Sequence, residues 1–287
     1  MLISSKNLLL TAREGGFAIP HFNFWDEMSA RAHVAAAEKK NVPILLAWAQ
    51  KHEADIDIDE ALILGKFYGA HAKVPIVLHL DHGFSPDLVK YGIDHGFTSV
   101  MIDASAEKFD KNVAVTKDVV DYAHQRGVVV EAEIGHVGTG LSADDANQYT
   151  EVEAAVEFVK RTNVDSLAVS IGTSHGVYKS AKTPHLNFER LSELRQAVAV
   201  PLVLHGGSSS GDENLSKAAA LGITKVNIYT DLANAALHAA QAEPYESVLK
   251  MIEAEQKAVE ALDEHYVDVF KTAKLHQIEE KTVLGAL

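Results

Sequence analysis

Short apolar runs alternate with longer amphipathic segments along most of the chain. The strand-like runs lie at 17–20, 43–47, 75–80, 99–102, 128–133, 166–170, 201–204 and 225–228. Several, such as Pro75-Ile-Val-Leu, are apolar at consecutive positions. This is typical of strands that are covered on both faces in a parallel sheet. Helical periodicity fills the intervals, at 27–39, 59–72, 86–95, 112–125, 152–160, 188–198, 212–220 and 230–240.

A strand followed by a helix, eight times over, predicts an α/β protein with a single (β/α)8 TIM barrel. No Ser/Gly/Pro-rich linker divides the chain, so we expect one domain over 1–287. Because such a barrel needs about 250 residues, we expect a C-terminal helical tail from about 244 to 287, with helices at 248–261 and 265–274. A doubly wound open sheet is the alternative, but no G-x-G-x-x-G follows the first strand.

The composition argues against several partners and types of chemistry. The 26 basic and 40 acidic side chains leave a net charge of −14, and the chain has no cysteine. The acidic balance argues against nucleic acid or an anionic membrane as a partner. The lack of cysteine excludes disulfides, thiolate nucleophiles and Cys-ligated zinc. No apolar run approaches the ~18 residues of a membrane span, and we find no signal peptide, so a cytoplasmic location is expected.

Polar residues gather where the predicted strands end, which is the face of a TIM barrel that carries the active site. His82, His175 and His205 each follow a strand directly, and each is followed by glycine. Three imidazoles with an open fourth position form a catalytic zinc site. The pattern therefore predicts such a site, with ordinary hydrogen-bonded histidines as the alternative.

The loops after the last two predicted strands are rich in hydrogen-bond donors. One reads His205-Gly-Gly-Ser-Ser-Ser-Gly, and the other, at 227–230, leads straight into a helix. In TIM barrels these loops and the helix N-terminus commonly hold a phosphate group. The alternative is an ordinary Gly/Ser loop in which Thr230 or Asp231 caps the helix.

Carboxylates accompany the predicted ligands. Asp81 could exchange a proton with a substrate hydroxyl beside a metal, or it could orient His82 instead. Glu131 and Glu133 share one face of their strand, so both should point into the barrel and need a partner or a metal. Asp103 is a candidate for a further orienting carboxylate.

At these residues the chain resembles the class II, metal-dependent ketose-bisphosphate aldolases, which include the fructose- and tagatose-bisphosphate aldolases. The likeness extends from about residue 17 to about residue 231. Its strongest blocks are HLDHG at 79–83, VEAEIG at 130–135, SLAVSIGTSHGVY at 166–178, LNFERLSELR at 186–195, PLVLHGGSS at 201–209 and ITKVNIYTDL at 223–232. Several blocks in the same order are far more specific than any one of them.

The resemblance implies a zinc-dependent aldehyde-lyase that reversibly cleaves a ketose phosphate to dihydroxyacetone phosphate and an aldehyde. The ketose would be fructose or tagatose 1,6-bisphosphate, or a ketose 1-phosphate. It also implies a homodimer or homotetramer and, in some members, a monovalent cation (Na⁺ or K⁺) near the phosphate.

The resemblance also assigns roles to residues. The implied zinc ligands are His82, His175 and His205, with Asp81 as the catalytic proton donor and acceptor and Glu133 as an alternative or second-site ligand. The implied substrate-binding residues are Asn23, Gly176, Gly206, Gly207, Ser208, Asn227, Ile228, Tyr229 and Thr230.

The chain departs from the family pattern in three places. It has AWAQ at 47–50 in place of a Ser/Thr-Pro/Glu-Gly turn, its loop after the fifth strand lacks the family's mobile Glu, and no arginine follows Arg195 to hold a distal phosphate. We therefore predict a preference for a ketose 1-phosphate or a bulkier or less charged aldehyde half, with Trp48 as an apolar wall. Lys271 and Lys274 could replace the arginine, but only as point charges.

Three other functions compete with this one. A Schiff-base aldolase needs a buried lysine within a barrel strand, and we expect neither Lys225, at the start of a strand, nor Lys179, in a loop, to be well placed. A barrel metallohydrolase would usually have His-x-His on its first strand, which His21-Phe-Asn23 does not provide. The third alternative is a noncatalytic phosphosugar-binding or stabilising partner of an aldolase complex. The presence of Asp81 and of all three histidines argues against it.

Overall fold

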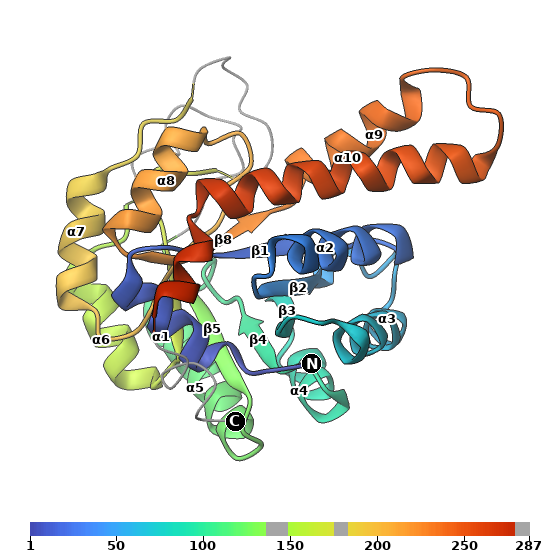
Figure 1. The fold of residues 1–287 in the computed structure, drawn as a ribbon. Coiled ribbons are helices and arrows are strands. Elements are labelled where there is room, and N and C mark those ends of the chain that lie inside the picture. Colours follow the sequence, from blue (N-terminus) through green and yellow to red (C-terminus); the bar gives the residue numbers. More distant parts are fainter. Residues whose placement is uncertain (136–148, 175–182, 279–287) are drawn as a thin grey trace.

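Eight parallel strands close into a barrel in the computed structural model of the chain, which describes residues 1–135, 149–174 and 183–278 (Figure 1). The strands are β1 (Ile19–Asn23), β2 (Ile44–Ala49), β3 (Ile76–Gly83), β4 (Ser99–Ile102), β5 (Val129–Ile134), β6 (Ser166–Val169), β7 (Leu202–Leu204) and β8 (Ile223–Ile228). Each strand pairs with the next, and β8 pairs with β1. The predicted TIM barrel is confirmed, and the open sheet is excluded.

Helices form an outer ring around the strands. They are α2 (Glu27–Lys40), α3 (Ile58–His71), α4 (Pro86–His95), α5 (Phe109–His124), α6 (Val152–Thr162), α7 (Phe188–Ala197), α8 (Asp212–Leu221) and α9 (Thr230–Gln241). Local sequence signals set their bounds. For example, Ser85 caps the start of α4 with Pro86 in the first turn, and α4 ends before Gly96, whose backbone is left-handed with a φ of 116°.

An additional helix, α1 (Ser5–Gly15), closes the N-terminal end of the barrel. Its apolar side chains Leu8 and Leu9 pack with Ile19, Leu45 and Val77 at the starts of the first three strands. We did not predict this helix. Since apolar residues fill that end of the barrel, the space for polar chemistry lies at the opposite end, where the strands finish.

The C-terminal tail differs from the prediction. One continuous helix, α10 (Val248–Val269), replaces the two expected helices, and a 3-10 segment, η3 (Thr272–Gln277), follows it. No glycine or proline interrupts 262–264, so the helix continues through them. Figure 1 shows α10 running beside α9 and over α2, the two helices that it contacts most. Neither α10 nor any other helix in the described part of the chain is both long and apolar enough to span a bilayer.

Candidate active site

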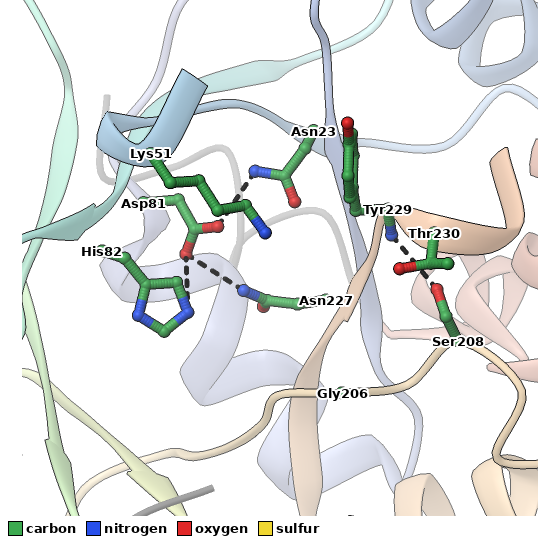
Figure 2. Close-up of a pocket in the computed structure, with 9 residues that line it drawn as sticks. All are labelled: Asn23, Lys51, Asp81, His82, Gly206, Ser208, Asn227, Tyr229 and Thr230. Carbon is green, nitrogen blue, oxygen red and sulfur yellow. Dashed lines mark hydrogen bonds and ion pairs between the residues drawn. The ribbon is translucent and has the colours of Figure 1, made fainter. Parts of the chain in front are cut away.

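Asp81 and His82 are neighbours on β3, yet both line one pocket at the C-terminal end of the barrel (Figure 2). Successive side chains of a regular strand point to opposite faces, so the strand must be irregular here. His82 has a left-handed backbone with a φ of 47°, and the pairing with β4 shifts between Leu80 and Gly83. A Cβ atom at Gly83 would lie 2.2 Å from Val89 Cγ2, so only glycine fits. This bulge turns both functional side chains toward the same site.

The carboxylate of Asp81 is held by amides from two other strands. Asn23 Nδ2 donates to Asp81 Oδ2 over 2.9 Å, and Asn227 Nδ2 donates to Oδ1 over 3.1 Å. Burial alone would raise the pKa of Asp81, but the surrounding imidazoles, His82 first among them, and the Lys225 ammonium hold it well below its usual range. Asp81 is therefore an ionised, oriented carboxylate at neutral pH that can accept a proton.

Two of the three predicted zinc ligands lie together. His82 Nε2 and His205 Nδ1 are 2.9 Å apart, and Asp81 Oδ1 lies 4.0 Å from His82 Nε2. Glu133, the alternative ligand, places its Oε2 atom 3.9 Å from His205 Nδ1. The third predicted ligand, His175, lies outside the described residues. The potential ligand atoms of Asp81, His82 and His205 all lie within 4.8 Å of one another, so the described residues can hold a metal ion.

The second nitrogen of each of these imidazoles is bound by a carboxylate. His82 Nδ1 lies 2.7 Å from Asp103 Oδ2, and His205 Nε2 lies 2.8 Å from Glu131 Oε1. An ionised carboxylate only accepts hydrogen bonds, so His82 Nδ1 and His205 Nε2 each carry a hydrogen, and one proton lies between the two nitrogens that face each other. Loss of that proton leaves a lone pair on each of these nitrogens, as in metal-binding histidines. Burial lowers the pKa of His82, but the nearby carboxylates, Asp81 foremost, raise it to about 9. A cation between the rings would replace that proton, so the donor set fits a divalent metal.

Glu131 connects this cluster to a lysine inside the barrel. Lys225 Nζ lies 3.0 Å from both Glu131 oxygens and 2.8 Å from Asn227 Oδ1, and its side chain is fully buried. Because β8 begins at Ile223, Lys225 lies within a barrel strand rather than at its start, so that expectation is wrong. Its ammonium is ion-paired, however, and it does not line the pocket, which disfavours a Schiff-base role. Lys179 lies outside the described residues.

Two further imidazoles lie near Asp81, and our sequence analysis did not select either as a site residue. His21 Nε2 on β1 lies 3.7 Å from Asp81 Oδ1, and the rings of His21 and His79 are 5.2 Å apart. Burial, with the Lys225 ammonium second, lowers both histidine pKa values well below 6.5, so both rings are neutral. Among the described residues, neither His21 nitrogen has a hydrogen-bond partner. Strand alternation could have identified His79, because it lies two residues before Asp81 on the same face.

The predicted phosphate loops meet the same pocket. Five of the predicted substrate residues line it there: Gly206, Ser208, Asn227, Tyr229 and Thr230. Ser208 Oγ accepts hydrogen bonds from the backbone nitrogens of Tyr229 and Asp231, over 3.3 and 3.2 Å. The N-cap residue of α9, Tyr229, makes no capping hydrogen bond through its own side chain. The Asp231 carboxylate instead accepts from the Ser209 backbone nitrogen over 2.8 Å, so the alternative in which Thr230 or Asp231 caps the helix is not observed.

Other predicted substrate residues lie behind the pocket or outside the described chain. The Gly207 backbone nitrogen donates to the Asn227 carbonyl over 3.1 Å, and the Ile228 side chain is fully buried in the core. Gly176 and the loop at 136–148, where we noted the missing Glu, are not among the described residues. Their roles in substrate binding stay predictions.

Lys51 lines the pocket, and our sequence analysis missed it. It lies in a 3-10 turn, η1 (Gln50–His52), directly after β2. Its Nζ atom lies 4.8 Å from the centroid of the Tyr229 ring, and Figure 2 shows the side chain extending into the pocket. Among the described residues, no other lysine or arginine lines this pocket.

Two expectations about the aldehyde half are wrong. Trp48 is fully buried, and its Nε1 donates to the Ile56 carbonyl over 2.9 Å, so it forms no wall of the pocket. Lys274 Nζ donates to the Gly16 carbonyl, at the N-terminal end of the barrel. Lys271 directly precedes η3, two residues after the end of α10, and neither lysine lines the pocket.

Comparison with known proteins gives a consistent result. The sequence pattern of the family "Fructose-bisphosphate aldolase class-II" matches residues 3–274. The chain is 39% identical over 246 residues to the YdjI protein of Escherichia coli. These residues cover 85% of this chain and 88% of that protein. The crystal structure of the YdjI aldolase has a TM-score of 0.87 at 36% identity, over 95% of this chain and 98% of that one. The fructose-bisphosphate aldolase of Campylobacter jejuni shares the fold, with a TM-score of 0.81 at 23% identity, over 94% of this chain and 96% of that one.

Proposed function

The chain belongs to the class-II fructose-bisphosphate aldolase family, and on this premise we propose that it is a zinc-dependent aldolase that reversibly cleaves a ketose phosphate to dihydroxyacetone phosphate and an aldehyde. One observation carries the proposal. An ionised Asp81, oriented by two amides, lies directly beside the paired ring nitrogens of His82 and His205.

The residues divide the chemistry between them. A zinc ion held by His82, His205 and the predicted ligand His175, with Glu133 nearby, would supply a Lewis acid for the substrate carbonyl. Asp81 takes the proton from the hydroxyl on the carbon that becomes the aldehyde. The adjacent carbon–carbon bond then breaks, and its electron pair stays on the dihydroxyacetone phosphate half. In the reverse direction Asp81 returns the proton to the new hydroxyl.

The phosphate of that half is assigned to the loops around Ser208 and Thr230. The backbone nitrogens at the start of α9 and the helix dipole offer positive potential to an anion, and the N-cap residue Tyr229 makes no capping hydrogen bond through its own side chain. A fixed phosphate holds the reacting carbons next to Asp81 in the right orientation. The reaction then no longer depends on a chance collision in the correct geometry.

Lys51 changes our expectation for the aldehyde half. From the sequence we favoured a ketose 1-phosphate, because no arginine follows Arg195. Lys51, however, brings an ammonium into the pocket next to Tyr229. This placement favours a substrate with a second anionic group, such as fructose or tagatose 1,6-bisphosphate, over a ketose 1-phosphate.

Metal analysis combined with lyase assays tests the proposal. We expect about one zinc ion per chain, loss of activity with a chelator and recovery with added zinc. Kinetics on paired mono- and bisphosphorylated ketoses should then show a higher kcat/KM for the bisphosphate. Activity that survives chelation and is trapped by borohydride would favour a Schiff-base enzyme. Saturable binding of dihydroxyacetone phosphate without any lyase activity would favour the noncatalytic binding partner.

A further inference from the structure

The C-terminal helix α10 carries a buried carboxylate that the proposed chemistry does not use. Asp263 lies in the C-terminal half of α10 and is fully buried, as is His33 on α2. Asp263 Oδ2 lies 2.7 Å from His33 Nδ1. Burial of a carboxylate is unfavourable unless it is paired, and apolar side chains would fill the same space without that penalty. The pair therefore suggests a role beyond packing.

The second nitrogen of His33 leads toward the active site. His33 Nε2 lies 3.3 Å from the carbonyl oxygen of Asn23. A carbonyl only accepts, so Nε2 carries a hydrogen and donates it. The His33 ring also stacks on Phe22, with the ring centroids 5.3 Å apart, which limits its movement. Because the Asn23 side chain donates to Asp81, a continuous polar chain runs from Asp263 through His33 and Asn23 to Asp81.

A second polar link starts three residues further along α10, on the same face of the helix. The Tyr266 hydroxyl donates to Asp231 Oδ2, which also accepts from the Ser209 backbone nitrogen. The Asp231 backbone nitrogen donates to Ser208 Oγ over 3.2 Å. Ser208 lines the pocket, so this link ends at the loops assigned to the phosphate.

We propose that α10 is a positioning element for the active site, in which Asp263 holds Asp81 through His33 and Asn23, and Tyr266 holds the phosphate loops through Asp231. The two links reach different parts of the site, so their loss has different kinetic consequences. Loss of the first misplaces the proton-transfer group and lowers kcat. Loss of the second loosens phosphate binding and raises KM. This inference rests on the proposed aldolase function.

The test of the first link separates position from stability. The double variant His33→Phe/Asp263→Leu exchanges the polar pair for apolar side chains, an exchange that is often neutral or stabilising for the fold. We expect kcat to fall about 10-fold or more, because small misplacements of catalytic groups are costly, with unchanged KM, Tm and zinc content. The matched control is Asp268→Asn. It removes an exposed ion pair between α10 and Lys40 of α2, and we expect it to change neither kcat nor KM.

Tyr266→Phe tests the second link. We expect a higher KM for the ketose phosphate and weaker binding of dihydroxyacetone phosphate by calorimetry, with kcat unchanged. A double variant with parental kcat overturns the Asp263 link, and Tyr266→Phe with parental KM and affinity overturns the Tyr266 link. A parallel loss of kcat and Tm in the double variant also overturns the first link, since it indicates a structural role only. If that variant does not fold, Asp263→Asn is measured in the same way. A parent protein without lyase activity contradicts the proposed function instead, and the binding of dihydroxyacetone phosphate then decides the Tyr266 link.

Discussion

Replacement of Glu131 gives the most direct test of the buried polar centre. Glu131 Oε1 lies 2.8 Å from His205 Nε2, and both Glu131 oxygens lie 3.0 Å from Lys225 Nζ. The glutamate side chain is 2% exposed and the lysine side chain 0%. Glu131→Gln keeps the shape and one acceptor oxygen but removes the charge. The ammonium of Lys225 then loses its ion-pair partner inside the barrel.

Removal of one partner from a buried ion pair typically costs about 3–5 kcal/mol. We expect about 3 kcal/mol here, the lower end of that range, because Asn227 Oδ1 still accepts from Lys225. At about 2 °C per kcal/mol for a chain of this size, Tm falls by roughly 6 °C. The affinity for zinc should also fall about 10- to 100-fold, since a partner that orients a metal-binding imidazole has lost its charge.

Urea unfolding and zinc titration measure the two effects separately. The control is Glu131→Gln/Lys225→Met, which removes the unpaired ammonium as well. It should recover most of the unfolding free energy but not the affinity for zinc, because His205 still lacks its carboxylate. A Glu131→Gln protein with the parental urea midpoint and the parental affinity for zinc would refute this reasoning.

Three further predictions concern single side chains. Asp81→Asn should lower the steady-state cleavage rate about 10²- to 10⁴-fold, the range for loss of a general acid–base group. Circular dichroism should show an intact fold. A smaller loss of rate would contradict the role of Asp81 in proton transfer. Lys51→Met should raise KM for a bisphosphorylated ketose roughly 10-fold, as expected for a lost charge-assisted contact; an equal rise for the ketose 1-phosphate would contradict the assignment of Lys51 to a second anionic group. Burial and the hydrogen bond to Asp231 raise the pKa of Tyr266 far above its usual value, so its contribution to stability is present below about pH 10 and is lost as the pH rises above that value. Urea midpoints measured at pH values below and above about 10 should therefore decline less with pH in Tyr266→Phe than in the parent. An equal decline in the two proteins would contradict the raised pKa of Tyr266.

The barrel could be predicted from the sequence because buried parallel strands leave continuous apolar runs, and eight of these recur with helical segments between them. Individual bounds differ by a few residues. For example, α5 begins at Phe109 rather than at residue 112. The unpredicted helix α1 does carry local signals, since Ser4 caps its start and Gly16, at a φ of 62°, ends it. These signals predict a helix but not its position, so the sequence alone did not indicate that this helix covers the N-terminal end of the barrel.

The site could be predicted only in part. Residues that directly follow strands, such as His82, His205 and Ser208, converge because strand ends meet on one face of a barrel. Lys51 has no such signal, since it lies in a polar stretch that reads like any exposed turn. The pairing of His33 with Asp263 joins residues 230 positions apart. It arises from how α10 packs on α2, which periodicity within each helix cannot reveal.

The bulge at the end of β3 has a practical consequence for protein engineering. The proton carrier and one metal-binding group are adjacent in the chain, and they face the same way only because His82 adopts a left-handed backbone and Gly83 leaves room for Val89. A graft of Asp81 and His82 alone onto another scaffold would separate them onto opposite sides of a flat strand. Designers who borrow this chemistry should therefore transplant the tripeptide together with its backbone distortion, as one inseparable component.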